Sequence, residues 1–101
     1  MRRATRQPKV GVKGITPFLW FDDQAEAAAK FYVSIFRDSR ITEVGRAPGS
    51  SSRKRGPVMT VSFELAGQPV LALNGGPGFP HSPAFSFFVS CSNQRQVDTL
   101  W

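Results

Sequence analysis

Several features are missing from this sequence, and each absence excludes a class of protein. A single cysteine, Cys91, rules out a disulfide within the chain, and zinc-finger spacings are absent. No apolar run is long enough to span a bilayer, and no signal-peptide or lipidation pattern is present. We therefore expect a cytoplasmic protein that does not engage membranes.

The length and composition describe one small globular unit. The chain has 101 residues, of which 41% are hydrophobic, and nine are Phe. A chain of this size buries only roughly two thirds of its unfolded surface, so a large enclosed cavity needs a partner. A homodimer is the partner that we expect.

The positive charge is concentrated in two segments. The formal net charge is +6, but residues 1–13 carry five cations and no acid, and residues 53–55 carry three more. These eight cations exceed the net charge, so the remaining chain is slightly acidic. Both segments are poor in apolar residues, which predicts solvated tails, including a disordered basic leader over residues 1–14. Nucleic-acid binding also requires aromatic side chains beside the cations, and the Phe residues follow strand patterns instead, which argues against nucleic acid.

The first part of the chain shows a strand signal and then a helix signal. Residues 15–21 are β-branched and aromatic and too short for a helix, which predicts a strand with Pro17 near its start. Asp22 or Asp23 then offers an N-cap, with Glu26 at the capping-box spacing from Asp23. The apolar positions that follow at helical spacing predict one buried stripe, made of Ala28, Phe31, Tyr32, Ile35 and Phe36.

Three more strands are predicted before residue 74. They lie at residues 40–46, 58–65 and 69–73, and Ala66-Gly67-Gln68 forms a tight hairpin between the last two. Residues 15–73 therefore have the order βαβββ. One face of the middle strand is apolar and the other is polar. The apolar set is Met59, Val61, Phe63 and Leu65, and the opposite set is Val58, Thr60, Ser62 and Glu64.

A second unit follows a Gly- and Pro-rich linker at residues 74–83. Residues 84–90 predict a strand, and Ser92 or Asn93 caps a helix. Because strand and capped helix recur without three returning strands, residues 84–101 look like a truncated repeat of the first unit. The apolar end of this helix would suit a dimer that exchanges these half-modules. Its apolar positions are Val97, Leu100 and Trp101.

Five separated strings carry a resemblance to a known family. They are residues 15–22 (ITPFLWFD), 28–36 (AAKFYVSIF), 59–65 (MTVSFEL), 73–77 (LNGGP) and 97–101 (VDTLW). Together with the βαβββ order they resemble the PhnB-like branch of the vicinal-oxygen-chelate superfamily, a branch often labelled demethylubiquinone methyltransferase-like. The superfamily includes glyoxalase I, extradiol dioxygenases and bleomycin-resistance proteins. The resemblance implies an α+β fold, a βαβββ module of the glyoxalase type plus the first strand and helix start of a second module.

The resemblance implies a cup on the concave face of the sheet that holds a small ligand. In metal-dependent relatives, side chains on its strands bind a divalent ion, and these positions fall here near Thr16, Thr60 or Val61, and Ser86. None of these is His, Glu or Asp, so we expect no metal. We expect no other cofactor, because the glycines after residue 74 are followed by Pro80 rather than by the helix that a methyl-donor site needs.

Strand alternation predicts the lining of this cup. Its aromatic and hydroxyl side chains suit a small, partly apolar molecule, although the same polar row could equally be the wet outer face of a sheet. Glu64 is the candidate general base, and a solvated strand carboxylate is its alternative. Asn74 could hydrogen-bond a ligand or simply form the turn before Gly75. The candidate ligand-binding residues are Thr16, Phe18, Trp20, Thr60, Ser62, Asn74, Ser86 and Phe88.

Two further reactive side chains have plain structural interpretations. His81 lies between prolines without an acid or nucleophile nearby in the sequence, which indicates a loop side chain, and Cys91 reads as a small buried hydrophobe. Three functions stay open at this stage. They are binding of a small molecule in the cup, an enzyme that uses Glu64, and an interaction protein that uses its basic tail.

Overall fold

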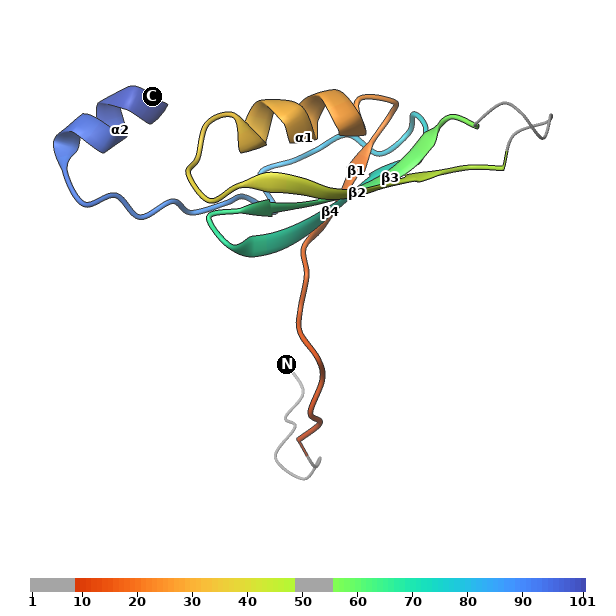
Figure 1. Ribbon diagram of the computed structural model, residues 1–101, viewed down its shortest axis with the longest axis horizontal. Coiled ribbons are helices and arrows are strands. Elements are labelled where there is room, and N and C mark those ends of the chain that lie inside the picture. Colours follow the sequence, from red (N-terminus) through yellow and green to blue (C-terminus); the bar gives the residue numbers. More distant parts are fainter. Residues whose placement is uncertain (1–8, 49–55) are drawn as a thin grey trace.

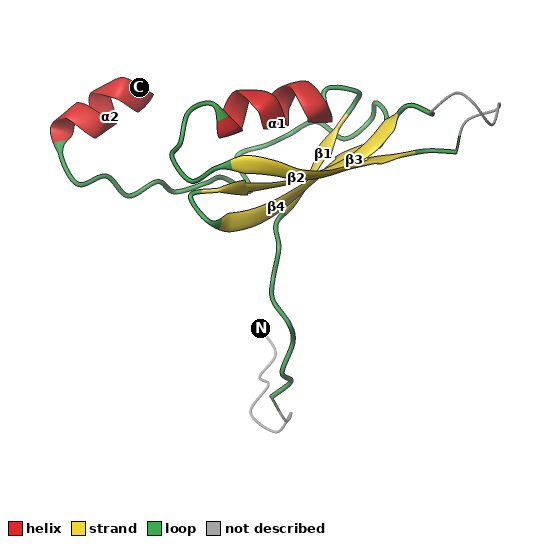
Figure 2. Ribbon diagram, viewed as in Figure 1, coloured by secondary structure: helices red, strands yellow, loops and turns green. Residues whose placement is uncertain are grey.

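The computed structural model describes residues 9–48 and 56–101 and has one mixed sheet with a helix on one side (Figures 1 and 2). The strand order is β1-β4-β3-β2, with β1 parallel to β4 and the other neighbours antiparallel. The elements are β1 (Phe18–Phe21), α1 (Ala25–Val33), β2 (Arg40–Arg46), β3 (Val58–Leu65), β4 (Gln68–Asn74) and α2 (Gln94–Leu100).

The βαβββ order and the α+β class are confirmed. β2 and β3 have the predicted bounds, and a two-residue loop, Ala66-Gly67, joins Leu65 to Gln68. Both loop residues have positive φ, at 50° and 87°, as a type I′ turn requires. β1 is shorter than predicted and begins at Phe18, because Pro17 has no N–H to donate and contributes only its carbonyl oxygen, which accepts from the N–H of Leu71.

The core lies between α1 and the sheet. Val61 and Phe63 face the helix, which confirms the apolar side predicted for β3. Tyr32 stacks over Phe63 at a centroid distance of 6.5 Å. The fully buried core residues are Ala25, Ala29, Val61, Phe63, Val70 and Ala72.

Two details of the predicted helix are wrong. α1 begins at Ala25 with Gln24 as N-cap, and no side chain of the predicted capping box caps it. The buried stripe runs through Ala25 and Ala29 rather than through Phe31, which is 62% exposed. Small residues face the sheet because they let the helix approach it closely, while the larger ring turns outward.

The predicted strand at residues 84–90 is also wrong. This segment pairs with no strand of the described chain, and each of its residues is exposed. The alternating pattern is present, but a strand needs a neighbouring ladder to satisfy its N–H and C=O groups, and none lies beside it. α2 follows, capped as predicted by Asn93, whose Oδ1 accepts from the N–H of Gln96 at 2.9 Å.

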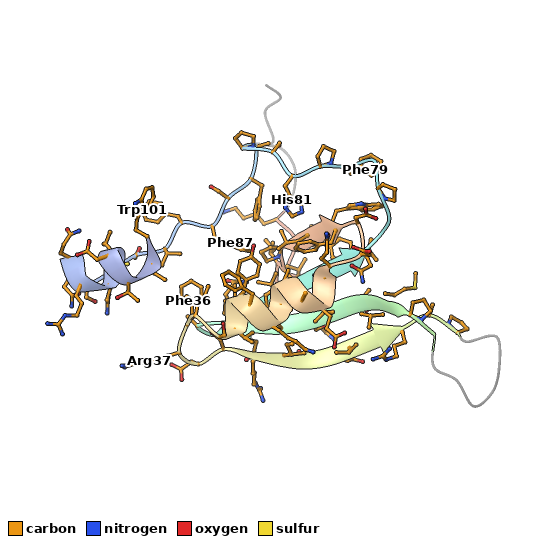
Figure 3. The ribbon with its side chains drawn as sticks, turned by 90° about the horizontal axis from the view of Figure 1, so that it is seen from above. Phe36, Arg37, Phe79, His81, Phe87 and Trp101 are labelled. Carbon is orange, nitrogen blue, oxygen red and sulfur yellow. The ribbon has the colours of Figure 1, made fainter. Side chains whose placement is uncertain are left out.

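α2 lies apart from α1 and the sheet (Figures 1 and 3). Val97, Leu100 and Trp101 are all exposed on it. The helices of the described chain have nine and seven residues, too few for either to cross a membrane.

Candidate functional site

The side of the sheet opposite α1, which we name the open face, brings together four of the eight predicted ligand-binding residues, Phe18, Trp20, Thr60 and Ser62. The strand register aligns Trp20 with Leu73 and Leu73 with Thr60. The next row aligns Phe18 with Leu71 and Leu71 with Ser62. Each row thus runs from an aromatic ring on β1 through a leucine on β4 to a hydroxyl on β3.

The Thr60 hydroxyl lies over Gly45 of β2. Gly45 pairs with Thr60, and a Cβ added at Gly45 would collide with this hydroxyl. The glycine therefore lets the Thr60 side chain lean over the neighbouring strand. Both Thr60 and Ser62 are half-buried.

Glu64 lies at the end of the same strand face and pairs with a cation. Its Oε1 accepts from Nε of Arg40 at 3.4 Å across the β2–β3 ladder. The two side chains are 33% and 73% exposed, so the pair contributes only about 0–1 kcal/mol to stability. The carboxylate stays accessible from the open face and is held at its edge.

Three predicted ligand-binding residues do not join the open face. Thr16 precedes β1 and is exposed. Ser86 and Phe88 lie in the segment that forms no strand, and Phe88 is 92% exposed. Their expected place in the cup depended on a strand at residues 84–90, so the correction to that strand removes them as well.

Asn74 has a structural role on the helix side of the sheet. Its Oδ1 accepts from the N–H of Ala25 at 2.8 Å, and its Nδ2 donates to the carbonyl oxygen of Val58 at 3.1 Å. Both ends of the amide therefore hold α1 and β3 to the end of β4. This arrangement leaves the amide no role on the open face.

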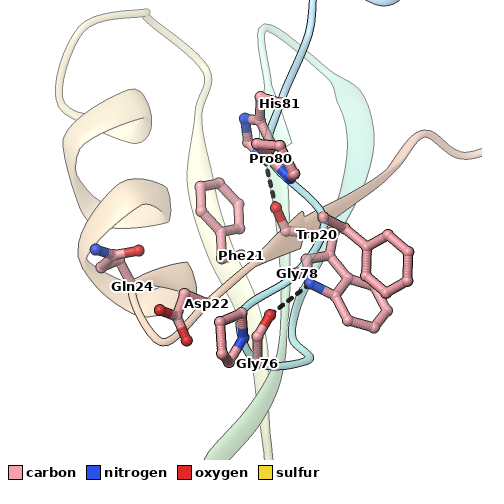
Figure 4. Close-up of a pocket in the computed structure, with 10 residues that line it drawn as sticks. Trp20, Phe21, Asp22, Gln24, Gly76, Gly78, Pro80 and His81 are labelled. Carbon is pink, nitrogen blue, oxygen red and sulfur yellow. Dashed lines mark hydrogen bonds between the residues drawn. The ribbon is translucent and has the colours of Figure 1, made fainter.

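The segment at residues 75–81 folds back over the end of β1 and fixes Trp20 (Figure 4). The indole Nε1 donates to the carbonyl oxygen of Gly76 at 2.8 Å, and the ring of Phe79 packs edge-on against the indole at 4.9 Å. Gly75 lies so close to the indole that a Cβ there would overlap the ring. The aromatic end of the open face is thus held in place by this segment.

His81 belongs to this segment and has a partner that the sequence did not indicate. Its Nε2 hydrogen-bonds the carbonyl oxygen of Trp20, and its ring packs edge-on against Phe21 at 5.0 Å. The side chain is exposed, as predicted for a loop residue. Cys91 is half-buried and has a free thiol. The basic residues 53–55 and residues 1–8 of the predicted leader, on which the basic-tail hypothesis rests, lie outside the described residues.

A family model and a solved structure identify the family of this chain. A sequence model of the 3-demethylubiquinone-9 3-methyltransferase family matches residues 13–101. The chain belongs to this PhnB-like family. Among solved structures, a PhnB protein from Bacillus cereus is 33% identical, with a TM-score of 0.74 over 87% of this chain and 70% of its own. A protein from Staphylococcus aureus is 30% identical, with a TM-score of 0.50 over 90% of this chain and 66% of its own. No curated protein matches.

In the described part of this PhnB-like chain, the positions where metal-dependent relatives hold an ion carry no metal donor. At the corresponding positions, Thr16 and Ser86 are exposed outside the sheet, and Val61 is buried beneath α1. Within residues 9–48 and 56–101, no three His, Cys, Asp or Glu side chains come together. Hydroxyl groups alone are poor ligands for zinc, nickel or iron, so the residues present do not fit these ions.

A methyl donor of the kind that the family name implies does not fit the glycines either. Gly75, Gly76 and Gly78 follow β4, but the chain continues from them through Pro80 and into an extended segment. A nucleotide-type cofactor is usually held where such glycines open a helix, whose N-terminal N–H groups face the ligand. We therefore derive no step that uses either group.

Leu71 and Leu73 are site residues that sequence reasoning missed. Alternation in β4 shows that they share a face, but not which strands lie on either side of them. Only the parallel pairing with β1 and the antiparallel pairing with β3 place them between the aromatic rings and the hydroxyls.

Proposed function

We propose that this PhnB-like protein binds a small, partly apolar molecule on the open face of its sheet. The observation that carries the proposal is the repeated row of aromatic ring, leucine and hydroxyl, Trp20–Leu73–Thr60 and Phe18–Leu71–Ser62. An aromatic and aliphatic surface provides the binding energy, and a few polar groups fix orientation, as in most small-molecule sites. The ligand lies with its apolar part on the leucines and a polar group at the two hydroxyls.

The position of Trp20 supports this proposal. A free indole on a sheet surface would lose rotamer freedom on binding, but here Gly75, Gly76 and Phe79 already restrict it. The indole therefore already has a fixed position in the free protein. This arrangement lowers the entropic cost of binding.

The test is a titration with neutral aromatic alcohols of about ten non-hydrogen atoms, followed by amide chemical shifts of the full chain. We expect shifts confined to β1, β3 and β4, and about a tenfold weaker affinity in Ser62→Ala, because a lost hydrogen bond is worth about 1 kcal/mol or more. Ser92→Ala is the matched control, since Ser92 is an exposed serine far from the open face. Shifts that spread over the whole chain, or equal effects of the two variants, would contradict the proposal.

A second candidate function is catalysis by Glu64. Its carboxylate borders the open face and is one third exposed, so it can reach a ligand held at Ser62. In that case Glu64→Gln abolishes turnover of a bound small molecule, whereas Glu26→Gln does not. Glu26 is the appropriate control because it is also a glutamate paired with a cation, Lys30, but lies on α1, on the other side of the sheet. Unchanged turnover in Glu64→Gln would exclude the candidate.

We also propose that two copies of the chain associate. α1 leaves Phe31 exposed, and α2 leaves Val97, Leu100 and Trp101 exposed, so each copy presents two apolar faces that a second copy can cover. Sedimentation equilibrium should give about twice the monomer mass, and Trp101→Ser with Leu100→Ser should reduce it. A stable monomer at a concentration of about 0.1 mM would exclude this dimer.

A further inference from the structure

A second site lies next to the open face, at the end of β1. An open pocket of about 390 Å³ is formed where residues 76–81 pass over β1 and face the start of α1 (Figure 4). None of the residues predicted from the sequence to bind a ligand lines it except Trp20. The lining residues used below are Phe21, Asp22, Gln24, Phe79, Pro80 and His81.

The walls of this pocket are aromatic and held in place. Phe21 and His81 pack edge to face at 5.0 Å, and Phe79 packs against Trp20 at 4.9 Å. The hydrogen bonds from His81 to the carbonyl oxygen of Trp20 and from Trp20 to Gly76 tie the segment to β1 at two points. The pocket is therefore a preformed feature of the fold rather than a gap between mobile side chains.

The charge around the pocket is negative. Asp22 lines it, and Asp23 follows directly. Neither carboxylate takes part in an ion pair within the described part of the chain. No Lys or Arg lines the pocket, and Lys30, on the same helix, is paired with Glu26 at 3.6 Å.

The start of α1 does not make the pocket favourable for anions. Helix N-termini favour anions because their first N–H groups are free. Here the N–H of Ala25 is already bonded to Asn74. An anion would therefore meet the carboxylate of Asp22 at the pocket wall, with Asp23 directly after it in the chain.

We propose that this pocket binds a small organic cation of the substituted-ammonium class. Aromatic faces attract such cations through their quadrupoles, and a carboxylate at the rim adds direct charge complementarity. The methyl groups of the cation lie against Phe21, Phe79 and Pro80, with the positive charge toward Asp22. A neutral molecule of the same shape gains the apolar contacts but not the electrostatic attraction.

The first test uses the full chain with Trp101→Phe, so that Trp20 is the only indole and reports on the pocket. Choline is titrated at about 0.15 M ionic strength, and 3,3-dimethylbutan-1-ol, in which carbon replaces the charged nitrogen, is the neutral control. We expect choline to bind with a dissociation constant of about 1 mM, as suits a ligand of few atoms in an open pocket. The neutral analogue should bind at least about tenfold more weakly. Equal binding of both molecules, or no binding of choline, overturns the proposal.

The second test compares two neighbouring carboxylates. Asp22→Asn removes the charge that lines the pocket, and Asp23→Asn removes the same charge one residue further along. We expect about a tenfold loss of choline affinity in the first variant and less than about a twofold loss in the second. Equal losses would show a general field effect and contradict a site at Asp22. Ser62→Ala should leave choline binding unchanged, so failure of this proposal and failure of the open-face proposal are separable.

Discussion

The side chain of Asn74 caps the first turn of α1 by accepting a 2.8 Å hydrogen bond from the backbone N–H of Ala25. The two residues are 49 positions apart, and the same side chain also donates to the carbonyl oxygen of Val58. One amide therefore joins the start of the helix to two strands. The core between α1 and the sheet depends on this junction as well as on its apolar contacts.

Asn74→Ala should lower the free energy of unfolding by about 2–3 kcal/mol, because it leaves the N–H of Ala25 and the carbonyl oxygen of Val58 without partners. Urea unfolding followed by circular dichroism measures this change. Asn93→Ala is the matched control, since Asn93 caps α2, which has no buried residue. A loss in the control as large as that in Asn74→Ala would mean that α2 contributes to the core.

Gly75→Ala should displace the indole of Trp20, because the added Cβ overlaps the ring. We expect loss of the Trp20–Gly76 hydrogen bond, a red shift of Trp20 fluorescence in the Trp101→Phe background, and a stability loss of about 1–3 kcal/mol. Gly14→Ala is the control, since no atom lies within 4 Å of a Cβ at that position. An unchanged emission spectrum would show that the indole is not held by this segment.

Ala66→Asn should stabilise the protein by about 0.5–1 kcal/mol. Ala66 has a φ of 50°, which is costly for alanine, whereas asparagine tolerates this region and is preferred in type I′ turns. The same substitution at Ala27, an exposed position of α1, should instead destabilise by several tenths of a kcal/mol because asparagine is a poorer helix former. Thermal unfolding distinguishes the two signs, and a lower melting temperature for Ala66→Asn would contradict the turn assignment.

Phe63→Ala should cost about 3–5 kcal/mol, since Phe63 is the largest fully buried side chain and its removal leaves a cavity beneath Tyr32. Phe88→Ala removes the same atoms from a ring that is 92% exposed and should change stability by less than about 0.5 kcal/mol. Chemical denaturation of both variants checks the difference. A large effect at Phe88 would indicate that a second copy covers it.

Local patterns predicted much of the fold and half of the open face. The period-2 alternation from Val58 to Leu65 correctly separates the apolar side, which packs against α1, from the polar side with Thr60, Ser62 and Glu64. The Ala66-Gly67 pair is a turn signal that needs no tertiary information. These features are local because each depends on backbone geometry over two to eight residues.

The misses share one physical cause, which is contact between residues far apart in the chain. Residues 84–90 have the pattern of a strand, but pairing requires a neighbour that composition cannot specify. Asp23 has the spacing of a cap, yet Asn74 is the residue that reaches the helix. Likewise, His81 gained its partner only when residues 75–81 folded over β1.

Short-range chemistry therefore decides which residues of this chain form strands, turns and an apolar face, since propensity and alternation act within a few residues. The three-dimensional arrangement decides which strand lies next to which, and so places Leu71 between Phe18 and Ser62 and builds a pocket beside Asp22. Strand register and the closure of a loop over a strand depend on contacts between segments that are far apart in the sequence. For that reason, they cannot be predicted from any one short segment.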